Sequence, residues 1–222
     1  MSSNRPTRSP SDFATDPAPG GSAAFRCGYV ALVGRPNAGK STLFNALVGQ
    51  RLSIVTAKPQ TTRGRLLGIL TLAECQLIFL DTPGILEAQY ALHEHMKRQI
   101  SSAAKEADVI LLLFDATRPL DRPELVTELL QNAASPVLPL LNKTDLVSVD
   151  ERDRIVEKVS REFGLESVRC ISALSGENVE SLAEDVAGVV PEGPKLYPDE
   201  MIAEQPERFF AAEIIREAAF NE

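Results

Sequence analysis

Eight residues near the start of the chain have the types and the spacing needed to hold a phosphate group. Residues 34–41 read GRPNAGKS, a full match to the pattern G-x-x-x-x-G-K-[ST]. Glycines in such a loop let backbone N–H groups turn inward around an anion. In this pattern Lys40 reaches the β- and γ-phosphates, and the Ser41 hydroxyl holds Mg²⁺. The predicted cradle comprises Gly34, Arg35, Pro36, Asn37, Ala38, Gly39, Lys40, Ser41 and Thr42.

The cradle alone predicts only a nucleoside triphosphate, so a kinase or an ATPase would fit it equally well. A second motif, Asp81-Thr82-Pro83-Gly84, follows an apolar run and adds a metal-directed carboxylate. We expect Asp81 to approach the metal through a bound water; a plain turn or helix-capping role is the alternative. The Gly84 N–H can approach a γ-phosphate because no side chain blocks it. The expected nucleotide contacts here are Thr82, Pro83, Gly84 and Ile85.

The four residues Asn142-Lys143-Thr144-Asp145 carry groups that distinguish one base from another. The Asp145 carboxylate can accept hydrogen bonds from N1–H and the N2 amino group of guanine, whereas adenine offers neither donor. Leaving that carboxylate unpaired in a desolvated site gives a discrimination of about 10⁴. We expect Asn142 to brace the cradle and the base, and the Lys143 stem to cover one face of the ring.

A fourth motif, Ser172-Ala173-Leu174, follows the last apolar run of the chain. Its Ala173 N–H can donate to the O6 atom of guanine. Taken singly, each short motif could be an ordinary surface turn. The four occur in one chain order, each after an apolar run, and together they favour a single guanine-nucleotide site.

Apolar runs and helical patterns alternate along the chain, which indicates the elements that position these motifs. Strand-like runs fall at 29–33, 65–71, 75–80, 109–114, 137–141 and 167–171, and helical spacing falls at 41–47, 90–106, 123–131, 150–163 and 176–190. This alternation predicts an α/β fold, a mostly parallel sheet with helices on both faces. Ligands bind at the carboxyl ends of the strands in such a sheet, where the four motifs lie.

Composition limits the class of protein. With 222 residues and 44% hydrophobic residues, the chain has enough material for one ordinary domain. Residues 1–24 are rich in Pro, Ser and Gly and are predicted to be a disordered tail. No apolar run approaches a membrane span and no secretory leader is visible, so a cytoplasmic location is expected. Cys27, Cys75 and Cys170 are expected to be buried free thiols, since neither a disulfide framework nor a zinc spacing is present.

Together the motifs resemble those of the P-loop GTPases that carry GxPNxGKS, TTR, DTPG, NKxD and SA signatures. Within that class, residues 58–65 look like the switch I of the Era family, and residues 196–217 look like its linker and the first helix of its RNA-binding KH domain. The resemblance covers residues 26–220. It implies a GTP-binding G domain at 25–190, then a linker and a KH domain truncated after its first helix at 191–222, as in a fragment or a shortened product.

The resemblance also implies how hydrolysis would proceed. Residues 60–64 would form the effector loop, in which Thr61 or, preferably, Thr62 ligates Mg²⁺ while the γ-phosphate is present. Ile85 stands where Ras-like enzymes carry the Gln that orients the attacking water, which implies slow turnover. Some similar GTPases use K⁺, held in part by the residue corresponding to Asn37, in place of an arginine finger. The implied metal ligands are Ser41, Thr62 and Asp81, and the implied catalytic residues are Lys40, Asn37, Thr62 and Gly84.

Family membership would further imply a monomeric GTP/GDP-binding protein that acts in small-subunit ribosome assembly and 16S rRNA processing, with a peripheral membrane contact. The alternative is a nucleotide-dependent binding module with negligible turnover. The net charge of −8 disfavours an RNA surface at first sight. Residues 191–222, however, hold eight acids and three bases, which is −5 of that total. The acidity therefore does not exclude an RNA partner.

The remaining features are weaker. Residues 206–220 place Phe210, Ala211, Ile214, Ile215 and Ala218 along one helical stripe, which would pack on the G domain, exchange with a partner or stay loose.

Two pairs of charged or titratable side chains carry no expected chemistry. His93 and His95 stand two residues apart, so they face different ways on a helix and are expected at the surface. Arg63 and Arg65 are expected to be solvated charges, with arginine fingers as the alternative.

Overall fold

The computed structural model describes residues 24–53, 66–81, 105–118, 123–206, 208–212 and 215. Within these residues a six-stranded sheet has the order β2-β3-β1-β4-β5-β6. Only β2 and β3 pair antiparallel, and the other neighbours pair parallel. This confirms the predicted mostly parallel sheet. The strands are β1 (Arg26–Gly34), β2 (Leu66–Thr71), β3 (Cys75–Asp81), β4 (Val109–Asp115), β5 (Val137–Asn142) and β6 (Arg169–Cys170).

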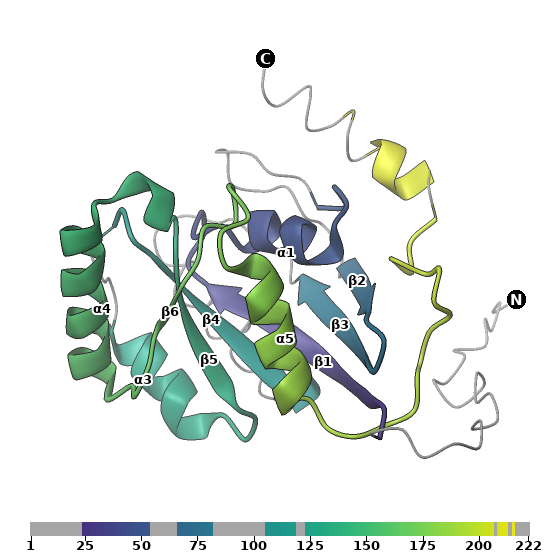
Figure 1. Cartoon of the computed structure of the whole chain (residues 1–222), viewed down its shortest axis with the longest axis horizontal. Coiled ribbons are helices and arrows are strands. Elements are labelled where there is room, and N and C mark those ends of the chain that lie inside the picture. The colour runs from purple at the N-terminus through teal and green to yellow at the C-terminus, as the bar shows by residue number, and fades with distance from the viewer. Residues whose placement is uncertain are drawn as a thin grey trace, which may run out of the picture.

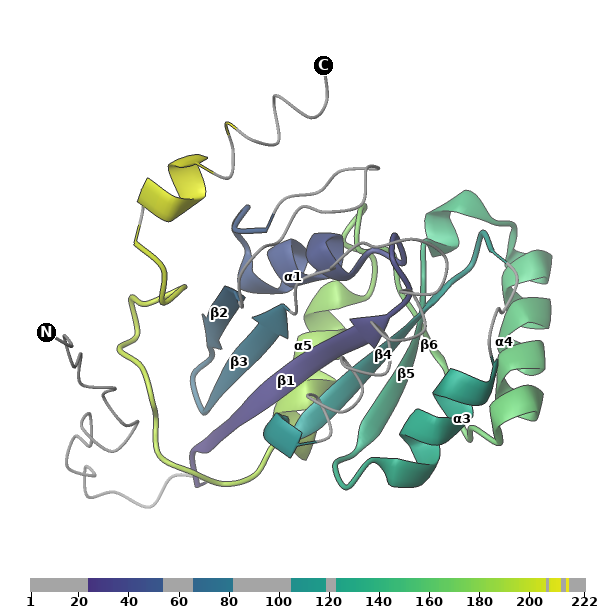
Figure 2. The ribbon, with the colours of Figure 1, turned by 180° about the vertical axis from the view of Figure 1, so that it is seen from behind.

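Helices cover both faces of the sheet, as predicted. Figure 1 shows α1 and α5 across one face, and Figure 2 shows α3 on the opposite face with α4 beside it. Alternate residues of each strand feed the two cores: Val30 and Leu32 pack with α1 and α5, whereas Ala31 and Val33 pack with α3 and α4. The helices are α1 (Lys40–Val48), α3 (Pro123–Asn132), α4 (Val149–Phe163) and α5 (Val179–Val189), with a short 3₁₀ turn η2 (Thr144–Leu146).

Local sequence explains the ends of α4. The Ser148 hydroxyl accepts a hydrogen bond from the Glu151 N–H at 3.3 Å, which caps the first turn. Gly164 ends the helix with φ 64°, the left-handed conformation in which glycine avoids the steric cost of a Cβ. Phe163, in the last turn, stacks on Phe114 of β4 at 5.7 Å between ring centroids. None of the helices in the described ranges has the length and apolar character needed to cross a membrane.

Two elements begin three residues away from their predicted starts, and β6 is shorter than the strand predicted at 167–171. β1 begins at Arg26 rather than Tyr29. Arg26 is tolerated in the strand because its guanidinium donates to the Val190 carbonyl at 2.6 Å, at the end of α5. α5 begins at Val179 rather than Gly176, because Gly176 and Asn178 adopt left-handed conformations and form a turn first.

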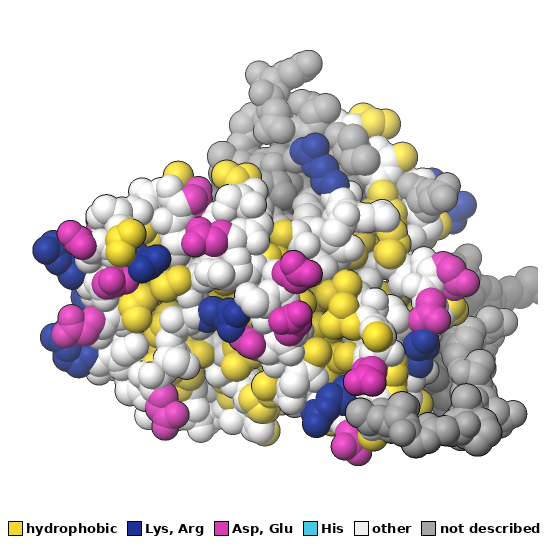
Figure 3. Space-filling model, viewed as in Figure 1, with side chains coloured by type: hydrophobic (Ala, Val, Ile, Leu, Met, Phe, Trp, Pro, Cys, Tyr) yellow, Lys and Arg dark blue, Asp and Glu magenta, His cyan; other side chains and the backbone are white. Residues whose placement is uncertain are grey.

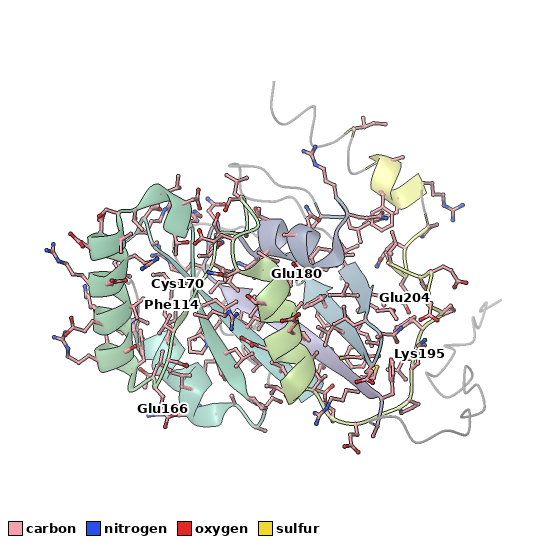
Figure 4. The ribbon with its side chains drawn as sticks, in the orientation of Figure 1. Phe114, Glu166, Cys170, Glu180, Lys195 and Glu204 are labelled. Carbon is pink, nitrogen blue, oxygen red and sulfur yellow. The ribbon has the colours of Figure 1, made fainter. Side chains whose placement is uncertain are left out.

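The residues after α5 run along the β1–β3–β2 side of the sheet (Figure 1). We call residues 191–205 the linker. The backbone of Glu192 forms an isolated antiparallel β-bridge with Arg26. The Ile202 carbonyl accepts a hydrogen bond from the Ile69 N–H of β2 at 2.9 Å. Lys195 and Glu204, labelled in Figure 4, lie near the two ends of the linker. The linker therefore packs against the sheet as an ordered segment.

Gln76 of β3 is the polar anchor of the linker. Its side chain is fully buried and its Oε1 accepts from the backbone N–H groups of Leu196 and Tyr197 at 3.0 and 2.9 Å. Its Nε2 donates to the Tyr197 carbonyl at 2.9 Å and to the Thr71 hydroxyl at 3.0 Å. A buried amide is stable here because each of its polar atoms has a partner.

The helical residues 208–212 follow the linker. Phe209 and Phe210 are half-buried, pack against the main core and meet edge to face at 5.4 Å. This start of the predicted helix therefore packs on the core of the α/β fold, which is the first of the three arrangements considered. Ala211 and Ile215 are exposed, Ile215 to 70%, so they do not share that contact. Ile214 and Ala218 lie outside the described residues.

The three cysteines are free, as expected, with Cys27 and Cys75 buried and Cys170 half-buried. Burial raises the pKa of the Cys75 thiol to about 11, so it stays protonated and unreactive near neutral pH. Several predictions fall outside the described residues: the tail up to residue 23, most of the helix at 90–106 with His93 and His95, and the arginines Arg63 and Arg65.

Replacing Gln76 by Ala should lower the free energy of unfolding by about 2–4 kcal/mol, because the polar groups of the linker would lose their buried partner. Urea unfolding followed by circular dichroism measures this loss. Gln131→Ala, on the exposed face of α3, is the matched control and should stay within about 0.5 kcal/mol of wild type. Equal unfolding free energies for both variants would contradict the anchor role.

Candidate functional site

The predicted cradle lies where the strand order of the sheet reverses. β1 lies between β3 and β4, and its carboxyl end leads directly into residues 35–39 and then α1. In open α/β sheets ligands bind at this switch point. Gly34 is required by packing, since a Cβ there would lie 2.8 Å from the Leu113 carbonyl oxygen of β4. The cradle is therefore pressed closely against the neighbouring strand.

The N-terminus of α1 is open to an anion. Gly39 occupies the N-cap position, no side chain caps the helix, and its first turn contains no acidic residue. Lys40, Ser41 and Thr42 are half-buried in that turn, so their N–H groups and the helix dipole favour a negative charge. Asn37 and Gly39 have φ values of 63° and 94°, which turn the loop back on itself. This backbone fits a phosphate.

The Lys40 ammonium lies across the loop. Its Nζ donates to the carbonyl oxygens of Gly34 and Arg35, both at 2.8 Å. The positive charge of Lys40 is thus held within the cradle. This is the position from which the sequence predicts that it reaches the phosphates. Pro36 is half-buried, and Asn37 is exposed at the tip of the loop.

Asn142 joins the cradle to two other strand-end loops. It ends β5, is 1% exposed, and its Nδ2 donates to the Ala38 carbonyl at 2.8 Å. Its Oδ1 accepts from the Ala173 N–H at 3.0 Å. The predicted brace between Asn142 and the cradle is present. It also explains Gly39, because a Cβ there would lie 2.2 Å from Asn142 Nδ2.

The loop at 172–174 is built as an ordered turn. Ser172 is fully buried, and its hydroxyl accepts from the Ser175 N–H at 3.1 Å, so its side chain supports the turn. The Ala173 N–H, predicted to donate to guanine O6, donates to Asn142 in this structure. If the Ala173 N–H also donates to guanine O6, it would share its hydrogen between that atom and the Asn142 side-chain oxygen. Leu174 is 79% exposed beside this loop.

The residues after β5 place the predicted base-binding groups near the same edge. Lys143 adopts φ 66°, which turns the chain from β5 into η2, and Asp145 is exposed in that turn. Thr144 ties the turn to β6, since its hydroxyl donates to the Ile171 carbonyl at 2.9 Å. The Asp145 carboxylate is therefore presented on a turn whose first residues are fixed in place.

Sequence reasoning missed Asp115, the last residue of β4. Its Oδ2 accepts a hydrogen bond from Lys143 Nζ at 2.6 Å, and the Asp115 side chain is only 6% exposed. Burial by itself raises the pKa of the Asp115 carboxyl, but hydrogen bonds from Lys143 and Thr117 outweigh burial and hold that pKa below its ordinary value. The signal in the sequence was an aspartate that ends an apolar strand, the pattern also seen at Asp81.

Part of the predicted metal and γ-phosphate site cannot be placed. Asp81 ends β3 next to β1, at the same edge as the cradle, but nothing is described of its side chain. The described residues include no group of three or more His, Cys, Asp or Glu side chains that could hold a metal alone. Mg²⁺ fits such a site, because it takes few protein ligands and completes its shell with phosphates and water. Outside the described residues lie Thr62, Thr82, Pro83, Gly84 and Ile85.

The fold, the open α1 terminus and the strand-end loops define a P-loop GTPase domain. A family model described as "50S ribosome-binding GTPase" matches residues 29–143. The chain is 45% identical over 201 residues to GTPase Era of Geotalea uraniireducens, covering 89% of this chain and 67% of that protein. It is 42% identical over 198 residues to GTPase Era of Clostridium perfringens, with the same shares covered. The chain belongs to the Era family of GTPases.

Solved Era structures agree with this assignment. An Era complex with MgGDPNP and nucleotides 1506–1542 of 16S ribosomal RNA superposes with a TM-score of 0.75 and 38% identity. An Aquifex aeolicus Era variant bound to GDP.AlF4⁻ gives a TM-score of 0.75 and 39% identity. Each superposition covers 87% of this chain and 66% of the Era chain. The chain thus spans about two thirds of the length of these relatives.

Gly39→Ala should weaken GDP binding at least about tenfold, because the new Cβ would displace the Asn142 amide from the cradle. Gly49→Ala is the matched control: Gly49 lies at the other end of α1, has φ 74°, and has nothing within 4 Å of a new Cβ. It should cost about 1 kcal/mol of stability and leave GDP binding unchanged. Isothermal titration with Mg·GDP measures both, and equal affinities for the two variants would refute the brace argument.

Proposed function

We propose that this chain is a slow GTP-hydrolysing switch of Era type. The observation that carries the proposal is the Asn142 side chain, which connects the phosphate cradle at Ala38 to the loop at Ala173. A phosphate site and a base site are thereby held at a fixed separation, as one nucleotide requires. GTP or GDP is the proposed ligand, with Asp145 reading the edge of guanine.

In this proposal the cradle neutralises charge that develops on the transferred phosphoryl group. Lys40 and the N–H groups at the start of α1 supply most of the stabilisation. Ser41 and Thr62, and Asp81 through a water, would hold Mg²⁺, which would add positive charge beside the phosphates. Asn37 helps to hold K⁺, and Gly84 donates to the γ-phosphate. The family resemblance supports the roles of Thr62 and Asn37.

We also propose a role in small-subunit ribosome assembly and 16S rRNA processing. The solved Era complex with 16S ribosomal RNA supports this more directly than the broad family description, which names the large subunit. In the same proposal residues 191–222 are a linker and the first helix of an RNA-binding KH domain. The protein acts as a monomer in the cytoplasm, with a peripheral contact to the membrane.

Single-turnover hydrolysis of GTP tests the proposed activity. Wild type should convert bound GTP slowly but measurably, and Lys40→Ala should lower the rate at least about 100-fold by removing the charge from the cradle. Lys158→Ala, on the exposed side of α4, is the control and should match wild type. A wild-type rate no faster than that of Lys40→Ala would instead support a binding module without turnover.

The same assay tests whether K⁺ takes part in hydrolysis. At equal ionic strength, hydrolysis in KCl should exceed hydrolysis in NaCl, and Asn37→Ala should remove most of the difference. Equal rates in the two salts would exclude K⁺ from the mechanism.

Filter binding with a 3′ fragment of 16S rRNA tests the ribosomal role. RNA affinity should be much weaker for this chain than for the chain extended by a complete KH domain, because nucleic-acid recognition in the proposal belongs to that domain. The face drawn in Figure 3 is not basic, since acidic and basic side chains are mixed over it. Equal affinity of the two chains would place the RNA site on the G domain instead.

A further inference from the structure

Asp115 lies outside the four sequence motifs, yet both oxygens of its carboxylate are engaged near the base-binding turn. Oδ1 accepts from the Thr117 N–H at 2.9 Å and from the Thr117 hydroxyl at 2.7 Å. Oδ2 accepts from Lys143 Nζ at 2.6 Å. The carboxylate is thus held in one orientation by its own turn and offers its remaining oxygen to Lys143.

The ion pair between Asp115 and Lys143 is largely shielded from water. The Asp115 side chain is 6% exposed and the Lys143 side chain 26% exposed. β4 and β5 place the two residues together: Asp115 is the register partner of Asn142, and the Ala116 N–H donates to the Asn142 carbonyl at 3.0 Å. Charged hydrogen bonds at such shielded positions are stronger than exposed ion pairs.

The contact fixes a side chain that is otherwise flexible. Lysine has a four-carbon stem with many rotamers, and ordering it during binding costs conformational entropy. Here the left-handed backbone of Lys143 fixes one end of the stem, and Asp115 fixes the ammonium at the other end. The stem is therefore ordered before any ligand arrives, which is how preorganisation raises affinity.

We infer that Asp115 is a positioning residue of the guanine site, which holds the Lys143 stem against the face of the base and thereby slows nucleotide release. This inference rests on the proposed binding of guanine nucleotides at this site. Asp115 does not touch the nucleotide itself. Through Lys143 it affects the contact with the face of the ring, whereas Asp145 contacts the edge of the ring. The two carboxylates therefore have separable effects on ligand choice.

Stopped-flow release of mant-GDP and mant-IDP tests the inference. Inosine lacks the N2 amino group and so weakens only the contact with Asp145. Asp115→Asn should speed release of both nucleotides about tenfold and leave the ratio of their release rates unchanged. Asp108→Asn is the matched control. Asp108 precedes β4 at its opposite end, where its carboxylate accepts from the Tyr29 N–H at 2.8 Å, and its replacement should not change release.

A second pair of variants separates positioning from a general structural role. Lys143→Met keeps an apolar stem without the ammonium. In that background Asp115→Asn should add less than about twofold to the release rate, because Asp115 acts through Lys143. Thr117→Val, which removes only the hydroxyl bond to Asp115, should have a smaller effect than Asp115→Asn.

Three results would overturn the inference. The first is release from Asp115→Asn at the wild-type rate. The second is a full tenfold effect of Asp115→Asn in the Lys143→Met background, which would indicate a structural role independent of Lys143. The third is a wild-type chain that retains no mant-GDP, and this result would also overturn the proposed function, whereas the first two leave that function standing.

Discussion

The site depends on one buried amide. The two polar atoms of the Asn142 side chain join the phosphate cradle to the loop after β6, at 2.8 and 3.0 Å. Replacing it would leave a buried carbonyl and a buried N–H without partners, at about 1–3 kcal/mol for each. The same amide leaves no room for a side chain at Gly39. The Asn142 side chain therefore sets the spacing between the cradle and the loop after β6, and it also requires a glycine at position 39.

The site binds an anion in an acidic protein because its positive character is local. The chain carries a net charge of −8, but α1 begins without a capping side chain or an acid in its first turn, and the Lys40 ammonium lies across the loop. Backbone dipoles act over a few ångströms, whereas exposed charges beyond about 10 Å are screened by salt. Much of the acidity belongs to residues 191–222, so whole-chain charge is a poor guide to this site.

Sequence reasoning succeeded where short-range rules decide the structure. The strand runs, the helical runs and the order of the motifs follow from periodicity and local residue types, and the structure confirms them within the described residues. Its errors lie where distant residues intervene. β1 extends to Arg26 because the end of α5 satisfies the guanidinium. The motif alone also gave no sign that the Ala173 N–H, predicted to donate to guanine O6, donates to Asn142, which is 31 residues away in the chain.

The sequence by itself determined the α/β class, the phosphate cradle and the expected guanine specificity, because each depends on neighbouring residues whose types are readable. Only the tertiary structure decided which side chains support those motifs. Asp115 holds Lys143 across 28 residues, and Gln76 holds the backbone at Tyr197 across 121. Hydrogen-bond partners that far apart are selected by strand order and register, and a single sequence does not reveal either until the sheet is assembled.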